Sequence, residues 1–277
     1  MAGKLFVIGT PIGNLGDFSP RGIEALENSD FIAAEDTRVT VKLLNHFGIK
    51  KEMISYYEHN KLNRGEQIIS RILAGENCAL VSDAGMPAIS DPGEELVDSA
   101  HNAGITVESV PGPSAVTTAL ALSGMPSGRF CFEGFLSVNK AGRKQHLQEI
   151  KEETRTMIFY EAPHKLLATL KDMQEILGDR KIAIVRELTK IHESVFRTTL
   201  SDAVKFYSEN TPRGEFVLIL SGKDKEREEK LSLEQAISLA KTLMKNGESA
   251  SVAAKQAALA AGVKKSEIYK AIIDEKI

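Results

Sequence analysis

The feature that most constrains this fold is an alternation of short apolar segments with helix-like segments in the N-terminal part of the chain. Strands are expected at residues 5–8, 31–34, 78–82 and 106–110, because these apolar runs are short and end at turn residues. Helical periodicity is found at residues 37–47, 62–74 and 94–103, and Ser19 followed by Pro20 is typical of a further helix start. Such alternation predicts a mostly parallel sheet that is covered on both faces.

A second α/β unit is expected to follow a Ser/Gly/Pro-rich linker at residues 123–128. Its strands are expected at residues 130–133, 157–160, 182–186, 194–198 and 216–220, and its helices at residues 145–153, 164–177 and 201–208. The charged run at residues 223–230 predicts a solvated connector, and the residues after it have no strand signal. The sequence therefore predicts two α/β domains, residues 1–122 and 123–228, and a helical tail, residues 229–277.

Charge is distributed unevenly along the chain. The net charge is −3, which argues against a uniformly basic nucleic-acid binder. Residues 1–118 carry 9 Lys and Arg against 16 Asp and Glu, whereas residues 119–228 carry 18 against 16 and residues 229–277 carry 8 against 6. Because phosphates attract cations, we expect any nucleic acid to approach the later two thirds of the chain.

The two cysteines, Cys78 and Cys131, lie among apolar neighbours and predict neither a disulfide framework nor a metal site. We interpret them as small buried hydrophobes in a reducing compartment. The apolar runs are too short to cross a bilayer, and the chain starts directly with a strand-like segment. We expect a cytoplasmic protein that uses no metal and no membrane.

Three Gly/Pro-rich loops, at residues 9–17, 82–93 and 111–114, follow predicted strands. Each alone is consistent with a simple turn, but loops at the carboxyl ends of parallel strands line a ligand crevice. The Gly-x-Gly-x-x-Gly spacing and the P-loop motif are both missing, and Pro11 lacks an amide that a pyrophosphate would need. The loops therefore favour a ligand with an adenine, a ribose and an amino-acid group but no phosphate.

Six ordered motifs carry a resemblance to a known family. They are FVIGTPIGNL at residues 6–15, AAEDTR at 33–38, VSDAGMPAISDPG at 81–93, PGPSA at 111–115, YEAPH at 160–164 and RELTK at 186–190. Together they resemble the ribosomal RNA small subunit methyltransferase I family, a branch of the tetrapyrrole methylases, over roughly the first 222 residues. The resemblance implies S-adenosylmethionine in a cleft between the two α/β domains. It also implies methylation of a cytidine ribose 2′-oxygen in the decoding centre of 16S ribosomal RNA, and a homodimer.

The same resemblance implies cofactor contacts from both domains. These are Pro11, Asp83, Met86, Ser90, Ser114, Ala115, Tyr160 and Gly214. Asp83 suits the ribose hydroxyls or the ammonium group of the ligand, although an Asp in a turn often only accepts backbone amides.

Methylation of a hydroxyl requires an acceptor for its proton, and acids beside strand ends are the candidates. The main candidates are Glu35, Asp36 and Glu161, and Glu58 and His59 are further ones. Asp36 can equally be the N-cap of the following helix, and Arg38 can either bind a phosphate or pair with an acid. Tyr56 and Tyr57 would stack an extruded base, with His59 as an RNA contact at its edge or sugar, or the two tyrosines would simply end a strand in the core.

The expected RNA contacts lie mainly in two basic segments. The first contains Lys140, Arg143 and Lys144, after a stretch in which Ser137 stands where the family commonly has proline. The second contains Lys264 and Lys265, in a tail where Ala258, Gly262 and Ile268 have the spacing of a helix-turn-helix or of a plain helical hairpin.

Two rival functions share parts of this interpretation. A methyltransferase that acts on a tetrapyrrole or another small molecule would keep the cofactor site but would leave the basic segments unexplained. A non-enzymatic regulator would bind nucleic acid with its tail and sense S-adenosylmethionine with its α/β part. A dinucleotide-dependent oxidoreductase is disfavoured by the missing fingerprint.

Overall fold

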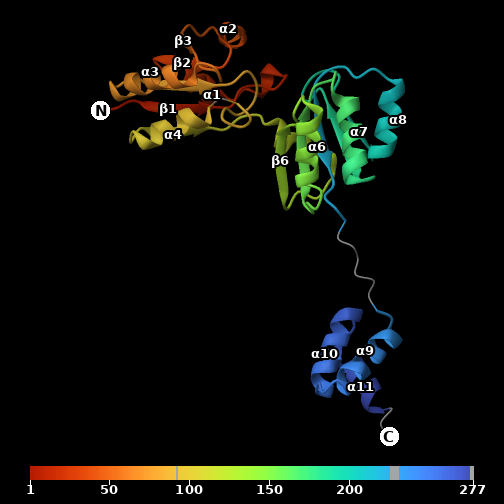
Figure 1. The fold of residues 1–277 in the computed structure, drawn as a ribbon. Coiled ribbons are helices and arrows are strands. Elements are labelled where there is room, and N and C mark those ends of the chain that lie inside the picture. Colours follow the sequence, from red (N-terminus) through yellow and green to blue (C-terminus); the bar gives the residue numbers. More distant parts are fainter. Residues whose placement is uncertain (92, 225–230, 275–277) are drawn as a thin grey trace. The chain divides into compact units, whose positions relative to one another are not determined.

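The structure, a computed structural model, describes residues 1–91, 93–224 and 231–274. These residues group into two compact units, Met1–Lys223 and Asp224–Ile277. The first unit contains two five-stranded sheets with helices packed on them, and the second contains helices (Figure 1). This agrees with the predicted architecture of two α/β sheets followed by a helical tail. Most of the charged run expected as a connector, residues 225–230, lies outside the described residues.

The first sheet is parallel throughout. Its strands are β1 (Lys4–Ile8), β2 (Phe31–Ala34), β3 (Glu52–Ser55), β4 (Cys78–Val81) and β5 (Thr106–Val110). They are arranged in the order β3-β2-β4-β1-β5, and every neighbouring pair is parallel. The chain crosses over β1 between β4 and β5, so the β1/β4 boundary is a topological switch point, where ligands bind in open α/β sheets.

Both faces of this sheet are covered, because successive strand residues point to opposite sides. On one face Ile8, Ile32 and Val81 pack against α1 (Pro20–Asn28) and α2 (Thr37–His46). On the other face Phe31 and Leu80 pack against α3 (Lys61–Leu73) and α4 (Glu94–Asn102). Full burial of each large side chain stabilises the fold by about 1.5–3 kcal/mol.

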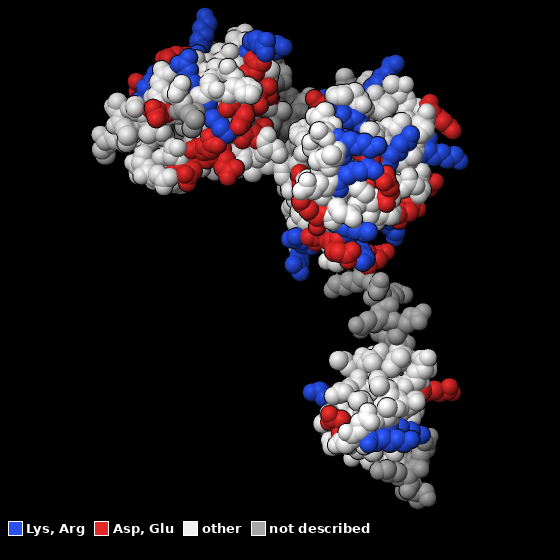
Figure 2. Space-filling view, in the orientation of Figure 1, with Lys and Arg blue, Asp and Glu red and all other residues white. Residues whose placement is uncertain are grey.

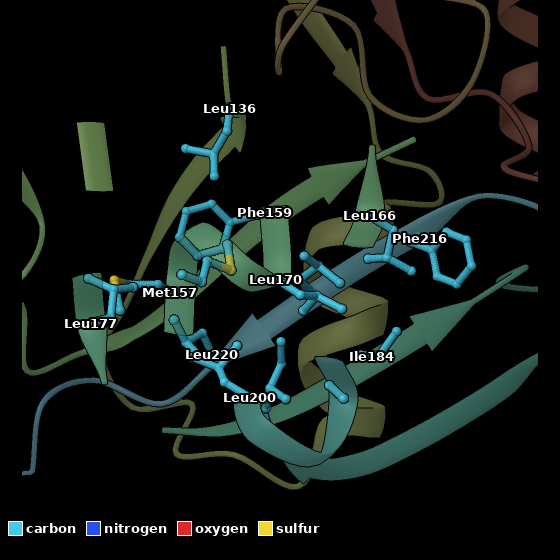
Figure 3. Close-up of a cluster of buried hydrophobic side chains, with 14 of the residues drawn as sticks. Leu136, Met157, Phe159, Leu166, Leu170, Leu177, Ile184, Leu200, Phe216 and Leu220 are labelled. Atoms are coloured by element: carbon cyan, nitrogen blue, oxygen red, sulfur yellow. The ribbon is translucent and has the colours of Figure 1, made fainter. Parts of the chain in front are cut away.

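The second sheet is mixed. Its strands are β6 (Phe130–Phe135), β7 (Thr156–Glu161), β8 (Lys181–Arg186), β9 (Ser194–Thr199) and β10 (Phe216–Leu220). They are arranged in the order β6-β7-β10-β8-β9, in which only the β6/β7 pair is parallel. Helices α6 (Lys140–Glu149), α7 (Leu166–Leu177) and α8 (Leu200–Glu209) cover one face. Figure 3 shows Phe159 and Ile184 of the sheet among Leu166, Leu170 and Leu200 of these helices.

The opposite face of the second sheet is covered by α5 (Ala115–Ser123). Val116, Ala119 and Leu120 of this helix pack against Val185 and Ile219. The helix precedes the expected domain boundary at residues 122 and 123 and yet packs on the second sheet. The segment at residues 111–114, which is one of the three Gly/Pro-rich loops, therefore connects the two sheets.

Helix α6 begins five residues earlier than the sequence predicted, so the first basic segment, residues 140–144, is helical. The side chain of Asn139 accepts a hydrogen bond of 2.8 Å from the Ala141 amide and is the N-cap of this helix. Asn is among the strongest N-caps, and this signal at residue 139 was missed. Its consequence is that Lys140, Arg143 and Lys144 have the i, i+3 and i+4 spacing of one side of a helix.

The C-terminal unit contains α9 (Leu233–Lys245), α10 (Ala250–Ala261) and α11 (Lys265–Asp274). Ser232 and Gln235 form a capping box at the start of α9. Ala258 and Ile268 are buried in this unit, and Gly262 ends α10 in a left-handed conformation with a φ of 68°. Small buried residues along α10 allow close packing of the helices.

Among the described residues, no helix is both long and apolar enough to cross a membrane.

Candidate active site

The three Gly/Pro-rich loops meet at the carboxyl edge of the first sheet. Thr10, after β1, and Gly85, after β4, exchange backbone hydrogen bonds of 2.8 and 3.1 Å. The loop after β5 lies against the loop after β1, because a Cβ on Gly112 would be 2.5 Å from the carbonyl oxygen of Gly9. Only glycine fits at such a close approach of two backbones. The loops are thus held together by backbone contacts at the switch point.

A cavity of about 370 Å³ lies at this edge, between the loops of the first sheet and strand ends of the second. Its lining residues are Ile12, Glu35, Asp83, Ala84, Gly85, Met86, Ile89, Asp91, Ser114, Ala115, Phe135, Tyr160, Glu161, Ala162, Pro163, Val185, Leu188, Glu215, Phe216 and Val217. Both α/β domains contribute, as expected for a cleft between them. The volume is in the range of small-molecule and cofactor sites.

Acidic groups and apolar groups dominate this lining. Five carboxylic acids are present, and none of the described lining residues is Lys, Arg or His. A negative, partly desolvated wall attracts a cationic ligand and repels phosphates. The apolar residues provide a surface for a flat ring.

Burial changes the acidity of these groups. It raises the pKa of Asp91 to about 6, and the nearby Glu35 and Asp83 carboxylates add to this effect. Burial is also the main cause of the raised pKa of Glu35 and of Asp83. Burial, with a smaller contribution from Asp91, raises the pKa of Tyr160 to about 12. Near neutral pH, Tyr160 therefore keeps its proton, whereas Asp91 is close to its own titration.

Glu35 and Asp83 connect two loops by a pair of hydrogen bonds. The amide of Asp83 donates to Oε2 of Glu35 at 3.2 Å, and the amide of Asp36 donates to Oδ1 of Asp83 at 3.1 Å. Asp83 therefore does accept a backbone amide, as the simpler interpretation held. Its Oδ2 has no hydrogen bond to another described residue and belongs to a side chain that lines the cavity.

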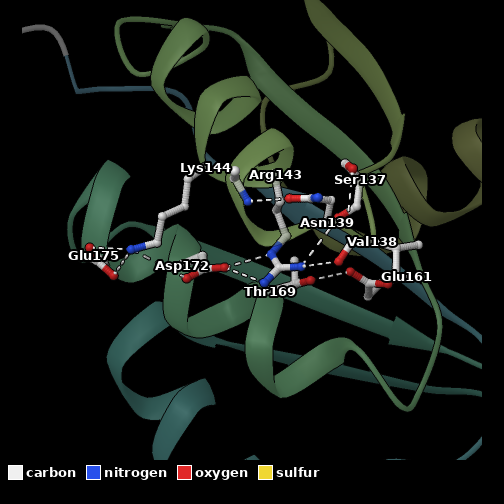
Figure 4. A network of polar contacts seen from close by, with 10 residues as sticks. Ser137, Val138, Asn139, Arg143, Lys144, Glu161, Thr169, Asp172 and Glu175 are labelled. Atoms are coloured by element: carbon white, nitrogen blue, oxygen red, sulfur yellow. Dashed lines mark hydrogen bonds and ion pairs between the residues drawn. The ribbon is translucent and has the colours of Figure 1, made fainter.

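The other two predicted catalytic acids differ in their surroundings. Glu161 lines the cavity, but its Oε1 accepts the Ala162 amide at 2.8 Å and its Oε2 accepts the Thr169 hydroxyl at 2.5 Å (Figure 4). Asp36 is not part of the lining. It is the N-cap of α2, where it accepts the Arg38 amide, and it pairs with the Arg38 guanidinium at 2.6 Å.

Most of the predicted cofactor contacts lie together in the structure. Asp83, Met86, Ser114, Ala115 and Tyr160 all line the cavity. The other three adjoin it in the sequence: Pro11 precedes Ile12, Ser90 precedes Asp91 and Gly214 precedes Glu215.

The predicted RNA contacts in the first unit have different exposure. Arg38 is exposed although it is paired with Asp36, and His59 is exposed beside Tyr57. Tyr56, by contrast, is only 2% exposed and is part of the core of the first sheet, as the simpler interpretation held.

The basic residues of α6 are divided between the surface and the interior. Lys140 is exposed, and Lys144 pairs with Glu175 at 2.6 Å. Arg143 is 7% exposed and lies in a buried ion pair with Asp172 at 2.6 Å (Figure 4). Its remaining contacts are the carbonyl oxygens of Ser137 and Val138 at 3.4 Å. These contacts give Arg143 a structural role in joining α6 to α7.

In the C-terminal unit, Lys264 and Lys265 are exposed at the start of α11. The ammonium group of Lys265 donates to the Ser251 hydroxyl at 2.7 Å.

Two residues of the cavity lining, Asp91 and Phe135, were not predicted from the sequence as site residues. Asp91 lies near the end of the loop at residues 82–93 and follows two non-glycine residues with positive φ, Ala88 and Ser90. Phe135 ends β6 and is 59% exposed. The available signals were an acid inside a Gly/Pro-rich loop and an aromatic residue directly after Gly134.

Among the residues that the structure describes, no group of three or more His, Cys, Asp or Glu side chains is arranged to hold a metal ion.

Residues 4–204 match the family described as Tetrapyrrole (Corrin/Porphyrin) Methylases. A protein from Synechocystis named "Ribosomal RNA small subunit methyltransferase I" is 47% identical over 96% of both chains. A protein of the same name from Thermotoga maritima is 47% identical over 222 residues, which are 80% of this chain and 100% of the relative. The crystal structure of the methyltransferase CobJ superposes with a TM-score of 0.60 at 19% identity, over 82% of this chain and 97% of that one. That likeness concerns the fold. With its cavity between two α/β domains, the chain belongs to the tetrapyrrole methylases and, within them, to the ribosomal RNA small subunit methyltransferase I family.

Proposed function

We propose that the protein uses S-adenosylmethionine to methylate the ribose 2′-oxygen of a cytidine in the decoding centre of 16S ribosomal RNA. The observation that carries this proposal is the cavity lining, which has five carboxylic acids and, among its described residues, no cation. S-adenosylmethionine carries a sulfonium and an ammonium group and no phosphate, so it fits such a wall, whereas a nucleotide phosphate would be repelled. The names of the relatives support ribosomal RNA as the substrate. The assignment of the target as the 2′-oxygen of a cytidine ribose rests on the family resemblance of the six motifs.

The residues that would hold the cofactor come from both sheets. The carboxylate of Asp83 would bind its ammonium group or ribose hydroxyls, and Met86, Ser114, Ala115 and Tyr160 would contact the rest of the molecule. We keep Pro11, Ser90 and Gly214 as adjoining contacts. When bound, S-adenosylmethionine supplies an electrophilic methyl group. The protein then has to orient the hydroxyl and to take up its proton.

Glu35 is the best suited of the three predicted acids to accept that proton. It lines the cavity, its pKa is raised by burial, and only its Oε2 is used by the Asp83 amide. A raised pKa makes a carboxylate a stronger base. Glu161 uses both oxygens within the protein, and Asp36 caps a helix, so both fit positioning roles better. Asp91 is a second candidate for the proton acceptor, because it also lines the cavity and burial also raises its pKa.

RNA would be bound by exposed cations outside this acidic cavity. The first domain has an excess of acids, and Lys and Arg side chains are prominent on the second α/β domain in Figure 2. We propose Lys140 and Lys144 on α6, Lys265 at the start of α11 and the preceding Lys264 as phosphate contacts, together with Arg38 and His59. Such contacts position the RNA but do not read its sequence.

The family resemblance supports two further parts of the proposal, a homodimer and a cytoplasmic location. Light scattering on the purified protein tests the first. A mass close to 60 kDa is expected, since one chain has 30.2 kDa, and a mass close to 30.2 kDa would contradict it.

The deciding experiment supplies methyl-labelled S-adenosylmethionine together with small ribosomal subunits, naked 16S ribosomal RNA or a porphyrinoid. We expect label in the RNA of at least one of the first two samples. Label in the porphyrinoid alone would contradict the proposal in favour of a small-molecule methyltransferase. Cofactor binding without transfer to any of the three would favour the regulator.

A further inference from the structure

A large aromatic side chain is exposed at the cavity and is not used by the proposed cofactor contacts. Phe135 lines the cavity and is 59% exposed, and Ile89, also part of the lining, is 49% exposed. Exposure of apolar side chains at a functional cavity marks a surface that another molecule covers.

The backbone of β6 is deformed in a way that turns Phe135 toward the cavity. The register with β7 shifts between Phe132 and Gly134, so that Glu133 is bulged out, and Gly134 has a φ of 64°. In a regular strand, residues three apart point to opposite faces. Here Phe132 and Phe135 both contact the Tyr160 ring, with centroid distances of 5.0 and 5.4 Å. The bulge therefore places Phe135 beside Phe132 and Tyr160 in one aromatic cluster at the cavity. Bulges often change the direction of a side chain beside an active site.

The loop that carries Ile89 lies next to the same bulge. A Cβ on Gly134 would be 3.3 Å from the Ser90 hydroxyl oxygen, which is closer than an ordinary van der Waals contact. Ile89 and Phe135 directly adjoin this contact in the two segments. The two exposed apolar side chains thus come from different domains, and both line the cavity.

We propose that Phe135, backed by Tyr160 and accompanied by Ile89, is the surface on which the base of the target nucleotide stacks. This inference rests on the proposed function. A ribose can reach an enclosed site only if its nucleotide leaves the helical stack, and the unstacked base is then held by an aromatic ring. Tyr56 is unable to do this because it is buried in the core, and Tyr57 is not among the lining residues. The substrate is accordingly a single-stranded or extruded nucleotide.

A stacking surface formed by Phe135 determines which nucleotides the site can accept. Stacking on an aromatic ring tolerates any base, because every base has a π face. Phe135 therefore distinguishes an unstacked nucleotide from a paired one, and it does not distinguish cytosine from uracil.

The test compares Phe135→Ala, Phe135→Trp and Phe130→Ala, at saturating cofactor, for methyl transfer to small ribosomal subunits. Phe130 is a matched control, since it is exposed on the same strand but does not line the cavity. Loss of stacking on one base is expected to lower kcat/KM for the RNA by about 5- to 150-fold in Phe135→Ala. Phe135→Trp and Phe130→Ala should stay within about twofold of the natural protein. Calorimetry should give the same cofactor Kd for all four proteins.

A second readout observes the base itself. A short RNA with a fluorescent cytosine analogue at the methylated position should change its emission on binding, and Phe135→Ala should abolish the change while Phe130→Ala keeps it. Two results would overturn the inference: normal kcat/KM in Phe135→Ala, or a weakened cofactor Kd that accounts for its whole defect. If the natural protein methylates no RNA at all, the proposed function fails instead, so the two failures are distinguishable.

Discussion

The backbone amide of Asp83 donates a 3.2 Å hydrogen bond to Oε2 of Glu35, which joins the loop after β4 to the end of β2 at the cavity. Asp83 in turn accepts the amide of Asp36 at 3.1 Å. Two carboxyl groups that a ligand could use are thus held by the backbone before any ligand arrives. Such preorganisation lowers the conformational cost of binding.

Replacement of Asp83 by alanine should weaken cofactor binding. A hydrogen bond to a charged group contributes about 1.5–3 kcal/mol, so we expect Kd to rise roughly 10- to 150-fold. Asp98→Ala, on the exposed side of α4, is the control and should have no effect. Calorimetry with S-adenosylmethionine measures both variants. An unchanged Kd in Asp83→Ala would remove this residue from the site.

Cofactor affinity should fall in mild acid. Burial raises the pKa of Asp91 to about 6, so this carboxylate is charged at pH 7.5 and mostly protonated at pH 5. If the charged form attracts the cationic ligand, Kd should rise up to about tenfold for each pH unit below 6. In Asp91→Asn the profile should be flatter over this range. A natural protein whose Kd is constant from pH 5 to 7.5 would contradict the electrostatic argument.

The same pKa shift has a consequence for folding, with a defined sign. Because the folded-state pKa of Asp91 lies above the unfolded value, its contribution to stability is present below about pH 4 and is lost as the pH rises through 6. Asp91→Asn should therefore raise Tm by a few degrees at pH 8 and leave it unchanged at pH 4. Differential scanning calorimetry at the two pH values tests this. A lower Tm at pH 8 would show that ionised Asp91 is stabilised by its surroundings.

The buried pair of Arg143 and Asp172 should matter for stability. Removing one partner leaves an unpaired buried charge, so Arg143→Ala should lower the free energy of unfolding by about 3–5 kcal/mol. The double variant Arg143→Met with Asp172→Leu should recover most of this loss. Lys140→Ala is the exposed control on the same helix, and urea denaturation is the measurement. If Arg143→Ala is as stable as the natural protein but binds RNA poorly, its role is phosphate binding.

Lys264 and Lys265 should contribute to RNA affinity through counterion release. Removal of two phosphate contacts should reduce the slope of log K against log salt by about 1–2. The double alanine variant is compared with Lys245→Ala on α9, and cofactor binding should be normal in both. An unaltered slope would make the tail structural.

The sequence predicted those parts of the molecule that depend on local signals. Ser19 and Pro20 begin α1 as expected, with the Ser19 hydroxyl accepting the Gly22 amide at 3.0 Å. The edge strand β3 was predicted only as one of two alternatives, in which Tyr56 and Tyr57 end a strand, because its four residues include just two apolar ones, Met53 and Ile54. The start of α6 was predicted five residues too late. The three basic residues after Asn139 were interpreted as phosphate contacts, and Asn139 was not identified as the N-cap of a helix.

The candidate site was predictable where a single loop defines it. The three Gly/Pro-rich loops were identified, since parallel strands bring their carboxyl ends to one edge. The roles of Asp91 and Phe135 were not, because they depend on the approach of two domains and on a bulge in β6. Burial of Arg143 depends on Asp172, which is 29 residues away and has no local signature.

The central claim, methylation at a ribose oxygen of RNA, is tested most directly by the chemical identity of the product. Small ribosomal subunits are incubated with the protein and labelled cofactor, and the RNA is digested to nucleosides and separated by mass. The account predicts that the label is in 2′-O-methylcytidine and that the adjoining phosphodiester resists alkaline hydrolysis. Label in a base-methylated nucleoside, or the absence of label from RNA, would contradict it.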